Sequence, residues 1–158
     1  MNVRIEGEKI VLRSVDSSDI DTILLWENSS AEPLYGVYEE HFSREDVVQF
    51  VENQQRYSLA ENEQLRLMIC SHEGERLGCI DLTEYDGKKA FVSILIFDLD
   101  NRRKGFAKSA LRLVVDYAKS LGMQTLYASI FPDNLPSLSL FKKFGFESVD
   151  GLLYCKEL

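Results

Sequence analysis

The chain has 158 residues, of which 45% are hydrophobic and 28% are charged, and its formal net charge at pH 7 is −8. These values fit a single soluble domain that buries a sizeable core. The negative charge disfavours general nucleic-acid binding, because polyphosphate would be repelled over most of the surface. It is compatible with a cationic small-molecule ligand, although acidity that only serves solubility is the commoner explanation.

The sequence shows no leader, membrane anchor or metal-binding motif. Its opening stretch, MNVRIEGEKI, lacks an apolar core and a cleavage signal, and the apolar run over residues 91–97 is too short to span a bilayer. The cysteines Cys70, Cys79 and Cys155 lie far apart, in expected strands, without metal-ligand spacing. We therefore expect a cytoplasmic protein with no membrane partner, no nucleic-acid partner and no metal.

The N-terminal part of the chain predicts one strand followed by two helices. Alternating apolar residues indicate a strand over residues 9–13. Over residues 14–28, Ser and Asp caps precede apolar residues at helical spacing, which predicts a helix. Residues 31–42 are irregular, and Ser43 then opens a second expected helix over residues 43–59.

The remainder predicts a three-stranded meander, a helix, a strand, a helix and two closing strands. Asp86-Gly87 is a hairpin signal between the second and third strands of the meander, so these run antiparallel. Apolar residues at helical spacing, ended by Gly122, predict a long amphipathic helix. The expected elements are strands over 64–71, 76–85 and 89–98, a helix over 104–121, a strand over 124–131, a helix over 134–144, and two strands after Gly145.

This order of elements indicates an α/β (α+β) fold. Strand 89–98, helix 104–121 and strand 124–131 form one crossover unit, so the two strands should run parallel. We predict one domain over residues 1–158, with a mixed, mostly antiparallel central sheet of about six to seven strands flanked by about four helices.

A basic loop stands out in this acidic chain, because Arg102, Arg103, Lys104 and Lys108 surround Gly105 where a strand ends and a helix begins. The first turn of a helix has unpaired N–H groups and a partial positive charge, and a glycine lets an anion approach the backbone. Cations at this end oppose the helix dipole, so stability alone would favour acids here. The loop therefore predicts a site for an anion such as a pyrophosphate, with a solvated basic turn as the alternative.

Four stretches resemble the GNAT N-acetyltransferases. RRKGFA (102–107) is similar to their R/Q-x-x-G-x-G/A signature, and residues 5–28 resemble the start of the RimJ/RimL-type branch. GCIDL (78–82) resembles the third strand of that branch, and NLPSLSLFKKFGF (134–146) its C-terminal N-x-x-S-x-x-L-Y-E-K-x-G-F block. The resemblance implies the GNAT fold and an acetyl-CoA-dependent N-acetyltransferase, with acetyl-CoA as cosubstrate.

The resemblance also implies roles for residues around the loop. The amides of residues 103–108 would hold the pyrophosphate, and the strand end at residues 95–97 would pair with the pantetheine arm. An N–H near Ile96 or Phe97 would stabilise the oxyanion. Asn134 would contact the pantetheine or simply cap its helix. The implied cofactor-binding residues are Leu95, Ile96, Phe97, Arg102, Arg103, Lys104, Gly105, Phe106, Ala107, Lys108, Asn134, Phe141 and Lys143, the last reaching the adenosine phosphate.

The catalytic groups depart from the family pattern. Phe141 stands where the family block carries a tyrosine whose hydroxyl protonates the leaving thiolate. Glu84 is the first candidate for the general base and Asp81 the second, and strand alternation places the two on opposite faces. The alternative for Glu84 is a solvated carboxylate beside a turn.

The acceptor site is expected in the acidic, aromatic segment 31–42, where Tyr35, Tyr38 and Glu39 suit a cationic amine, unless the segment is only a solvated loop. We predict direct attack by a primary amine on the acetyl group, with a polyamine- or aminoglycoside-like acceptor. The alternatives are a protein N-terminus of the ribosomal-protein type and a catalytically weak CoA-binding or sensing module. The sequence leaves the oligomeric state open, a homo-oligomer included.

Overall fold

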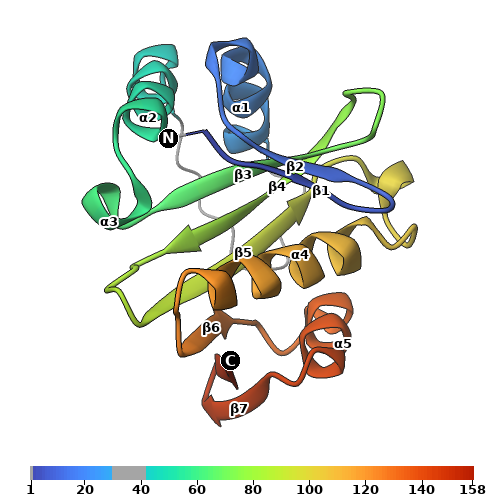
Figure 1. Cartoon of the computed structure of the whole chain (residues 1–158). Coiled ribbons are helices and arrows are strands. Elements are labelled where there is room, and N and C mark those ends of the chain that lie inside the picture. The colour runs from blue at the N-terminus through green and yellow to red at the C-terminus, as the bar shows by residue number, and fades with distance from the viewer. Residues whose placement is uncertain (1, 30–41) are drawn as a thin grey trace.

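The computed structural model of the chain describes residues 2–29 and 42–158 (Figure 1). Its strands are β1 (Arg4–Glu6), β2 (Val11–Ser14), β3 (Leu65–Cys70), β4 (Arg76–Thr83), β5 (Lys89–Ile96), β6 (Thr125–Ser129), β7 (Glu147–Asp150) and β8 (Leu153–Glu157). Its helices are α1 (Ile20–Glu27), α2 (Arg44–Arg56), α3 (Leu59–Asn62), α4 (Phe106–Ser120) and α5 (Leu135–Lys143), with 3-10 turns over Ser17–Asp19 and Leu99–Asn101.

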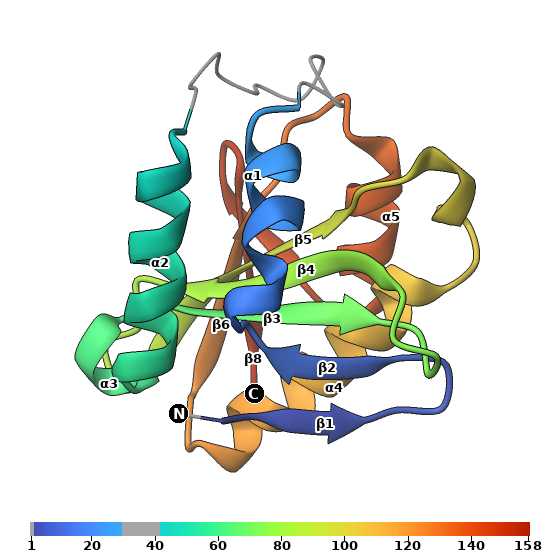
Figure 2. The ribbon, with the colours of Figure 1, turned by 90° about the horizontal axis from the view of Figure 1, so that it is seen from above.

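In the described part of the chain the strands form one mixed sheet in the order β1-β2-β3-β4-β5-β6-β8-β7, in which only β5 and β6 pair in parallel. Helices α1 and α2 cover one face of this sheet, and α4 and α5 lie on the other (Figures 1 and 2). The predicted α/β architecture and the crossover from β5 through α4 to β6 are confirmed.

The described residues contain eight strands and five helices, slightly more than expected from the sequence. The extra strand, β1, is three residues long and turns only Ile5 inward, so its alternation is too short to detect. The extra helix arises because the expected helix over residues 43–59 stops at Arg56, where Tyr57 adopts an extended backbone. Ser58 then caps the separate turn α3 through a reciprocal hydrogen bond with Glu61.

Two apolar clusters attach the helices to the sheet. On one face, α4 buries Ala110, Leu111, Val114 and Ala118 against strands β2 to β6, and each buried leucine or valine contributes about 1.5–3 kcal/mol. On the other face, residues of α1 and α2 pack on the inward-facing side chains of β3 and β4, including Cys79. This second cluster places the end of α1 above the middle of the sheet.

A buried ion-pair cluster fixes the start of α1. The Asp19 side chain is fully buried, and it accepts hydrogen bonds from Arg13 Nη1 and Nη2 at 2.8 Å each and from Arg76 Nε at 2.6 Å. Burial would raise the pKa of Asp19, but the hydrogen bonds from the two arginines outweigh it and hold that pKa below its usual value. Since Arg13 lies on β2 and Arg76 on β4, the cluster ties α1 to two strands.

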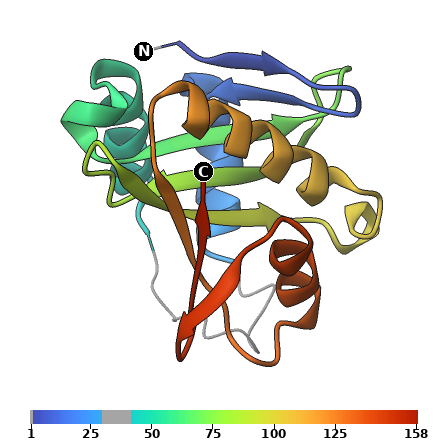
Figure 3. The same ribbon diagram turned by 60° about the horizontal axis from the view of Figure 1, so that its bottom comes forward.

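Strands β5 and β6 separate soon after they meet. Their pairing covers only Lys89–Phe91 and Thr125–Tyr127, although β5 continues to Ile96 and β6 to Ser129. Figure 3 shows the two strands diverging toward the end where α4 begins. The predicted splay is therefore present, and one edge of β5 beyond Phe91 lacks a strand partner among the described residues.

Candidate active site

The basic loop forms the N-terminus of α4, and its backbone is arranged to receive an anion. Gly105 is the N-cap residue with φ 83°, a left-handed conformation that favours glycine. Among the described residues no side chain caps α4, and the first turn of α4 has no acidic residue, whereas α2 and α3 each have a capping box with acidic residues. The first N–H groups of α4 thus have no side-chain acceptor among the described residues, which fits a diphosphate ligand.

Two cations connect this loop to the rest of the fold. Arg102 Nε donates to the Ile96 carbonyl at 3.2 Å, so its guanidinium lies between the loop and the end of β5, and partial burial lowers its pKa. Lys9, in the turn between β1 and β2, donates from Nζ to the Lys104 carbonyl at 3.2 Å. Sequence reasoning missed Lys9, because it is 95 residues away along the chain and has no motif of its own.

The end of β5 offers one N–H of the two expected from the sequence. The Phe97 N–H already donates to the Leu77 carbonyl at 3.1 Å, so the structure contradicts Phe97 as an oxyanion donor. In an antiparallel pair, every second residue of a strand directs its N–H toward the same neighbouring strand. Because the Phe97 N–H points to β4, the Ile96 N–H points to the opposite edge of β5, where β6 no longer pairs. Ile96 is therefore the remaining candidate of the predicted pair.

The backbone of β5 at Leu95 and Ile96 passes so close to residue 78 of β4 that only a glycine fits there. A Cβ atom added to Gly78 would lie 1.8 Å from the Leu95 carbonyl oxygen and 3.0 Å from Ile96 Cα. The close approach of the two backbones thus sets the position of residues 95 and 96. The resemblance of GCIDL to the family pattern includes this glycine, but it gives no physical reason for it.

The α5 residues predicted to contact the cofactor have mainly structural contacts. Asn134 Oδ1 accepts from the Ser137 N–H at 3.3 Å, which confirms the capping alternative for this residue. Phe141 is buried in the core and packs edge-to-face on Phe146 with ring centres 4.9 Å apart. Lys143 is exposed in the last turn of α5. Their contacts with acetyl-CoA remain predictions.

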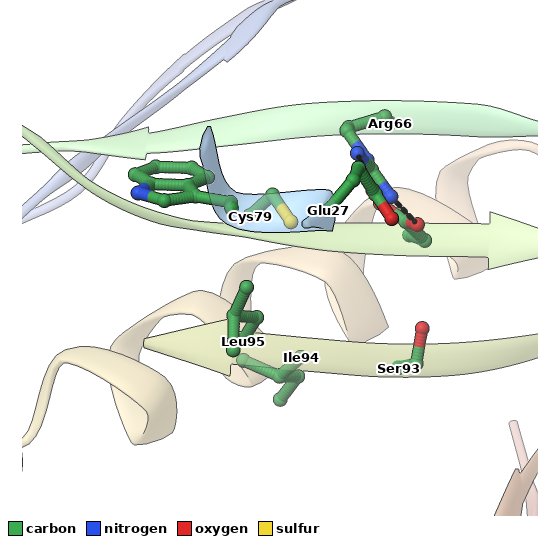
Figure 4. Close-up of a pocket in the computed structure, with 8 residues that line it drawn as sticks. Glu27, Arg66, Cys79, Ser93, Ile94 and Leu95 are labelled. Atoms are coloured by element: carbon green, nitrogen blue, oxygen red, sulfur yellow. Dashed lines mark hydrogen bonds and ion pairs between the residues drawn. The ribbon is translucent and has the colours of Figure 1, made fainter. Parts of the chain in front are cut away.

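A cavity of about 200 Å³ lies on the opposite face, between the end of α1 and strands β3 to β5 (Figure 4). In its lining, Arg66 Nε and Nη2 donate to the two carboxylate oxygens of Asp81, each at 2.8 Å, and Arg66 Nη1 donates to Glu27 Oε1 at 2.7 Å. We call these three residues the Arg66 cluster. The cavity is lined by Trp26, Glu27, Arg66, Cys79, Asp81, Ser93, Ile94 and Leu95.

The Cys79 thiol faces this cavity but is unsuited to be a nucleophile. Burial raises the pKa of Cys79 to about 12, and the nearby Arg66 charge only partly opposes this effect. The Cys79 thiol therefore stays protonated at neutral pH. It is inert there because the thiolate is the reactive form. Cys79 therefore does not supply a nucleophile to this cavity at neutral pH.

The carboxylates predicted as bases are placed differently from expectation. Glu84 follows the end of β4, is exposed and has φ 51°, and it is not among the described residues that line the cavity. Strand alternation fails for it because β4 ends at Thr83. Asp81 does line the cavity. Glu27 and Arg66, which no motif singled out, complete the site, and the predicted acceptor residues Tyr35, Tyr38 and Glu39 lie outside the described residues.

A second cavity of about 530 Å³ adjoins the first, between α1, α2 and the start of β3. The two cavities share Glu27 and Arg66 as lining residues. The second is lined by Ile23, Glu27, Phe42, Asp46, Val47, Gln49, Phe50, Gln64 and Arg66. An extended ligand can therefore contact Glu27 and Arg66 from either side.

Residues 9–147 match the family model described as an acetyltransferase (GNAT) domain. The chain belongs to the GNAT acetyltransferase family. The expectation of an acetyl-CoA-dependent N-acetyltransferase is thereby confirmed at the level of the family, and the α4 N-terminus fits its cosubstrate. The finer assignment to the RimJ/RimL-like branch stays a prediction.

Three similar proteins illustrate the range of the family. An uncharacterized protein of Methanocaldococcus jannaschii is 24% identical over 90% of this chain, and the chain spans 29% of that protein's length. Spermidine N-acetyltransferase from Vibrio cholerae, solved with CoA and spermine, has a TM-score of 0.78 and 18% identity, covering 96% of this chain and 94% of that one. Ribosomal-protein-S5-alanine acetyltransferase from Vibrio fischeri has a TM-score of 0.77 and 19% identity, covering 98% and 96%.

Two further observations concern the described ranges. No helix in residues 2–29 or 42–158 is long and apolar enough to cross a bilayer. No group of three or more His, Cys, Asp and Glu side chains in that part of the chain is placed to hold a metal ion.

Proposed function

We propose that this GNAT domain transfers the acetyl group of acetyl-CoA directly to the primary amine of a small cationic acceptor. The observation that carries the proposal is the charge of the cavity beside β5. Its described lining contains two carboxylates, Glu27 and Asp81, and one guanidinium, Arg66, so it has a formal net charge of −1. An ammonium group that entered this space would neutralise it.

The second cavity supports an acceptor with an apolar stem. Ile23, Val47 and Phe50 give it a mostly apolar wall, and Asp46 adds a further carboxylate. Ligand sites commonly combine an apolar lining with a few polar groups that orient the ligand. A short aliphatic or aromatic amine, or a polyamine with a second cation near Asp46, matches this arrangement.

The residues of the two faces would then act together. The α4 N–H groups, with the basic loop and Lys9, would bind the diphosphate, and the Ile96 N–H would donate to the developing oxyanion. When bound, acetyl-CoA supplies the activated acyl group. Holding the amine in the cavity beside Leu95 would provide catalysis mainly by positioning.

A protein N-terminus is the second candidate acceptor. The ribosomal-protein acetyltransferase of Vibrio fischeri has the same fold, and the α-amino group of a peptide would also neutralise the Arg66 cluster. The side chain of the first residue would occupy the second cavity in this case. The burial of Phe141 motivates a third candidate, a CoA-binding module with weak turnover.

The test is release of free CoA thiol with a panel of acceptors at fixed acetyl-CoA: putrescine, spermidine, tyramine and a peptide with an N-terminal alanine. We expect kcat/KM for at least one small amine to exceed that for the peptide by tenfold or more, in the range of ordinary substrate discrimination. A preference for the peptide would favour the second candidate. Acetyl-CoA binding by calorimetry without turnover on any acceptor would favour the third.

A further inference from the structure

Two carboxylates line the cavity, and they differ in how far Arg66 already engages their oxygens. Both oxygens of Asp81 accept from Arg66, and its side chain is 13% exposed. Glu27 accepts from Arg66 through Oε1 alone and is 32% exposed. Among the described residues, nothing donates to Glu27 Oε2. Since Glu27 lines both cavities, this oxygen belongs to the carboxylate that an entering ligand meets.

The position of Glu27 in its helix is unfavourable for stability alone. It is the last residue of α1, and the last turn of this helix has no basic residue. The C-terminal end of a helix carries a partial negative charge, so stability would favour Lys or Arg there. A carboxylate at this position therefore has to be held by another group, and Arg66 is that group.

Arg66 is itself fixed from three sides. Asp81 holds its guanidinium through two hydrogen bonds, and the Phe50 ring lies 4.9 Å from the guanidinium carbon. The Arg66 backbone N–H donates to Gln54 Oε1 at 2.8 Å. Burial lowers the pKa of Arg66, but the charges of Asp81 and Glu27 outweigh it, so the guanidinium stays charged. Glu27 is thus oriented by a rigid partner.

The cluster faces the strand where the acetyl group is expected. Ser93 of β5 is the register partner of Asp81, and its side chain points toward the Arg66 cluster (Figure 4). Leu95, two residues further along β5, lines the same cavity. A ligand amine beside Glu27 therefore lies in a space that Leu95 of β5 also lines.

We propose that Glu27 is the catalytic carboxylate that binds the acceptor ammonium and takes its proton, and that Arg66, held by Asp81, is its positioning residue. This inference rests on the proposed function. The ammonium gives one proton to Glu27 Oε2, and the lone pair of the neutral amine forms the N–C bond to the acetyl carbon. The C–S bond breaks, the second proton of the nitrogen goes to the thiolate, and Glu27 releases its proton to solvent. The products are the amide, CoA thiol and one proton.

The titratable and charged groups that face Glu27 come from three elements: Arg66 on β3, Cys79 and Asp81 on β4, and Asp46 on α2. Cys79 and Arg66 keep their protons through the neutral range. The rate should therefore respond to the availability of the neutral amine, and Asp81, the other carboxylate of the Arg66 cluster, provides a comparison variant.

The experiment compares Glu27→Gln, Glu27→Asp and Glu84→Gln with wild type, using the amine of the panel that wild type acetylates best. We expect Glu27→Gln to lower kcat/KM by about 10²–10⁴-fold, the usual contribution of a general base, while the dissociation constant of acetyl-CoA stays within twofold. In this variant the rate should rise about tenfold per pH unit between pH 7 and 9, because only solution supplies neutral amine. Wild type should show a shallower rise.

Further variants separate catalysis from folding. Glu52→Gln, on the exposed side of α2, is the matched charge-removal control and should keep wild-type kinetics. Glu27→Asp should keep part of the activity that Glu27→Gln loses, whereas a purely structural role would make both lose alike. Asp81→Asn releases Arg66 and should raise KM for the amine and lower kcat without changing acetyl-CoA affinity.

The outcomes distinguish this inference from the proposed function. If wild type acetylates no amine of the panel, both fail. If wild type acetylates an amine and Glu27→Gln stays within threefold of it, or if Glu84→Gln shows the large loss instead, the assignment of Glu27 is overturned and the proposed function stands.

Discussion

Gly78→Ala should disturb the β5 backbone that carries Ile96, the proposed oxyanion donor. The added Cβ would lie 1.8 Å from the Leu95 carbonyl oxygen and 2.8 Å from its carbonyl carbon. Ordinary carbon–oxygen contacts are about 3.3 Å or longer, so β4 and β5 must move apart by more than about 1 Å. Both contacting atoms belong to the backbone, and no side-chain rotation can relieve them.

The change in the free energy of unfolding of Gly78→Ala follows from two opposing effects. Insertion of a methyl group into a packed region costs about 1–3 kcal/mol, and removal of a glycine from the unfolded chain returns about 0.5–1 kcal/mol. We therefore expect Gly78→Ala to lower the free energy of unfolding by about 1–2 kcal/mol. Activity should fall more, because a 1 Å misplacement of a catalytic group costs about 10²-fold.

The assay combines urea unfolding, acetyl-CoA titration and the thiol-release rate. Gly7→Ala is a milder control: its added Cβ would lie 2.8 Å from the flexible tip of the Leu113 side chain and 3.0 Å from the Ile10 carbonyl oxygen, so its cost should stay below that of Gly78→Ala. Wild-type stability and kcat/KM in Gly78→Ala would refute the claim that the close approach of Leu95 positions this strand.

Three further predictions concern the loop and the buried ion pairs. Gly105→Ala and Gly122→Ala replace glycines with the same φ of 83°, so each should cost about 1–2 kcal/mol of stability. Only Gly105→Ala should also raise the dissociation constant of acetyl-CoA, by about tenfold. Equal acetyl-CoA affinities of the two variants in calorimetry would show that the loop is not part of the site. Lys9→Gln should weaken acetyl-CoA binding about threefold at low ionic strength and less at high salt, whereas Lys119→Gln, at the other end of α4, should have no effect; identical affinities for both variants would show that Lys9 does not contact the ligand. Because the pKa of Asp19 is depressed in the folded state, its stabilisation is complete above its unfolded pKa of about 3.9 and is lost as pH falls through the lower folded value. Asp19→Asn should cost about 3–5 kcal/mol at neutral pH and flatten the acid limb of the urea-midpoint profile, and an unchanged limb would contradict this account.

Much of the fold was predictable because its determinants are local. The amphipathic period of α4, the stop at Gly122 and the hairpin at Asp86-Gly87 depend on residues within one or two turns of each other. The basic loop was equally visible, since its four cations surround one glycine. Errors occurred at element ends, where one residue decides the outcome: Glu84 leaves the strand, and Tyr57 divides a helix.

The cluster of charges on the other face of the sheet was not predictable in this way. Glu27 and Arg66 are 39 residues apart, and Arg66 and Asp81 are 15 apart. Neither spacing is a motif, and only the register of β3 on β4, with α1 packed above, brings the three charges together. Phe97 shows the same limit, because a partner on β4 decides whether its N–H is available.

The sequence by itself therefore determined most of the elements, their order and the basic loop at the start of α4, because periodicity, turn chemistry and a glycine among cations act over a few residues. The tertiary structure alone decided that Glu27 has an oxygen without a described donor, that the Ile96 N–H points away from β4, and that Lys9 joins the loop. These depend on sheet register and helix packing, which set distances between residues that the chain order leaves far apart.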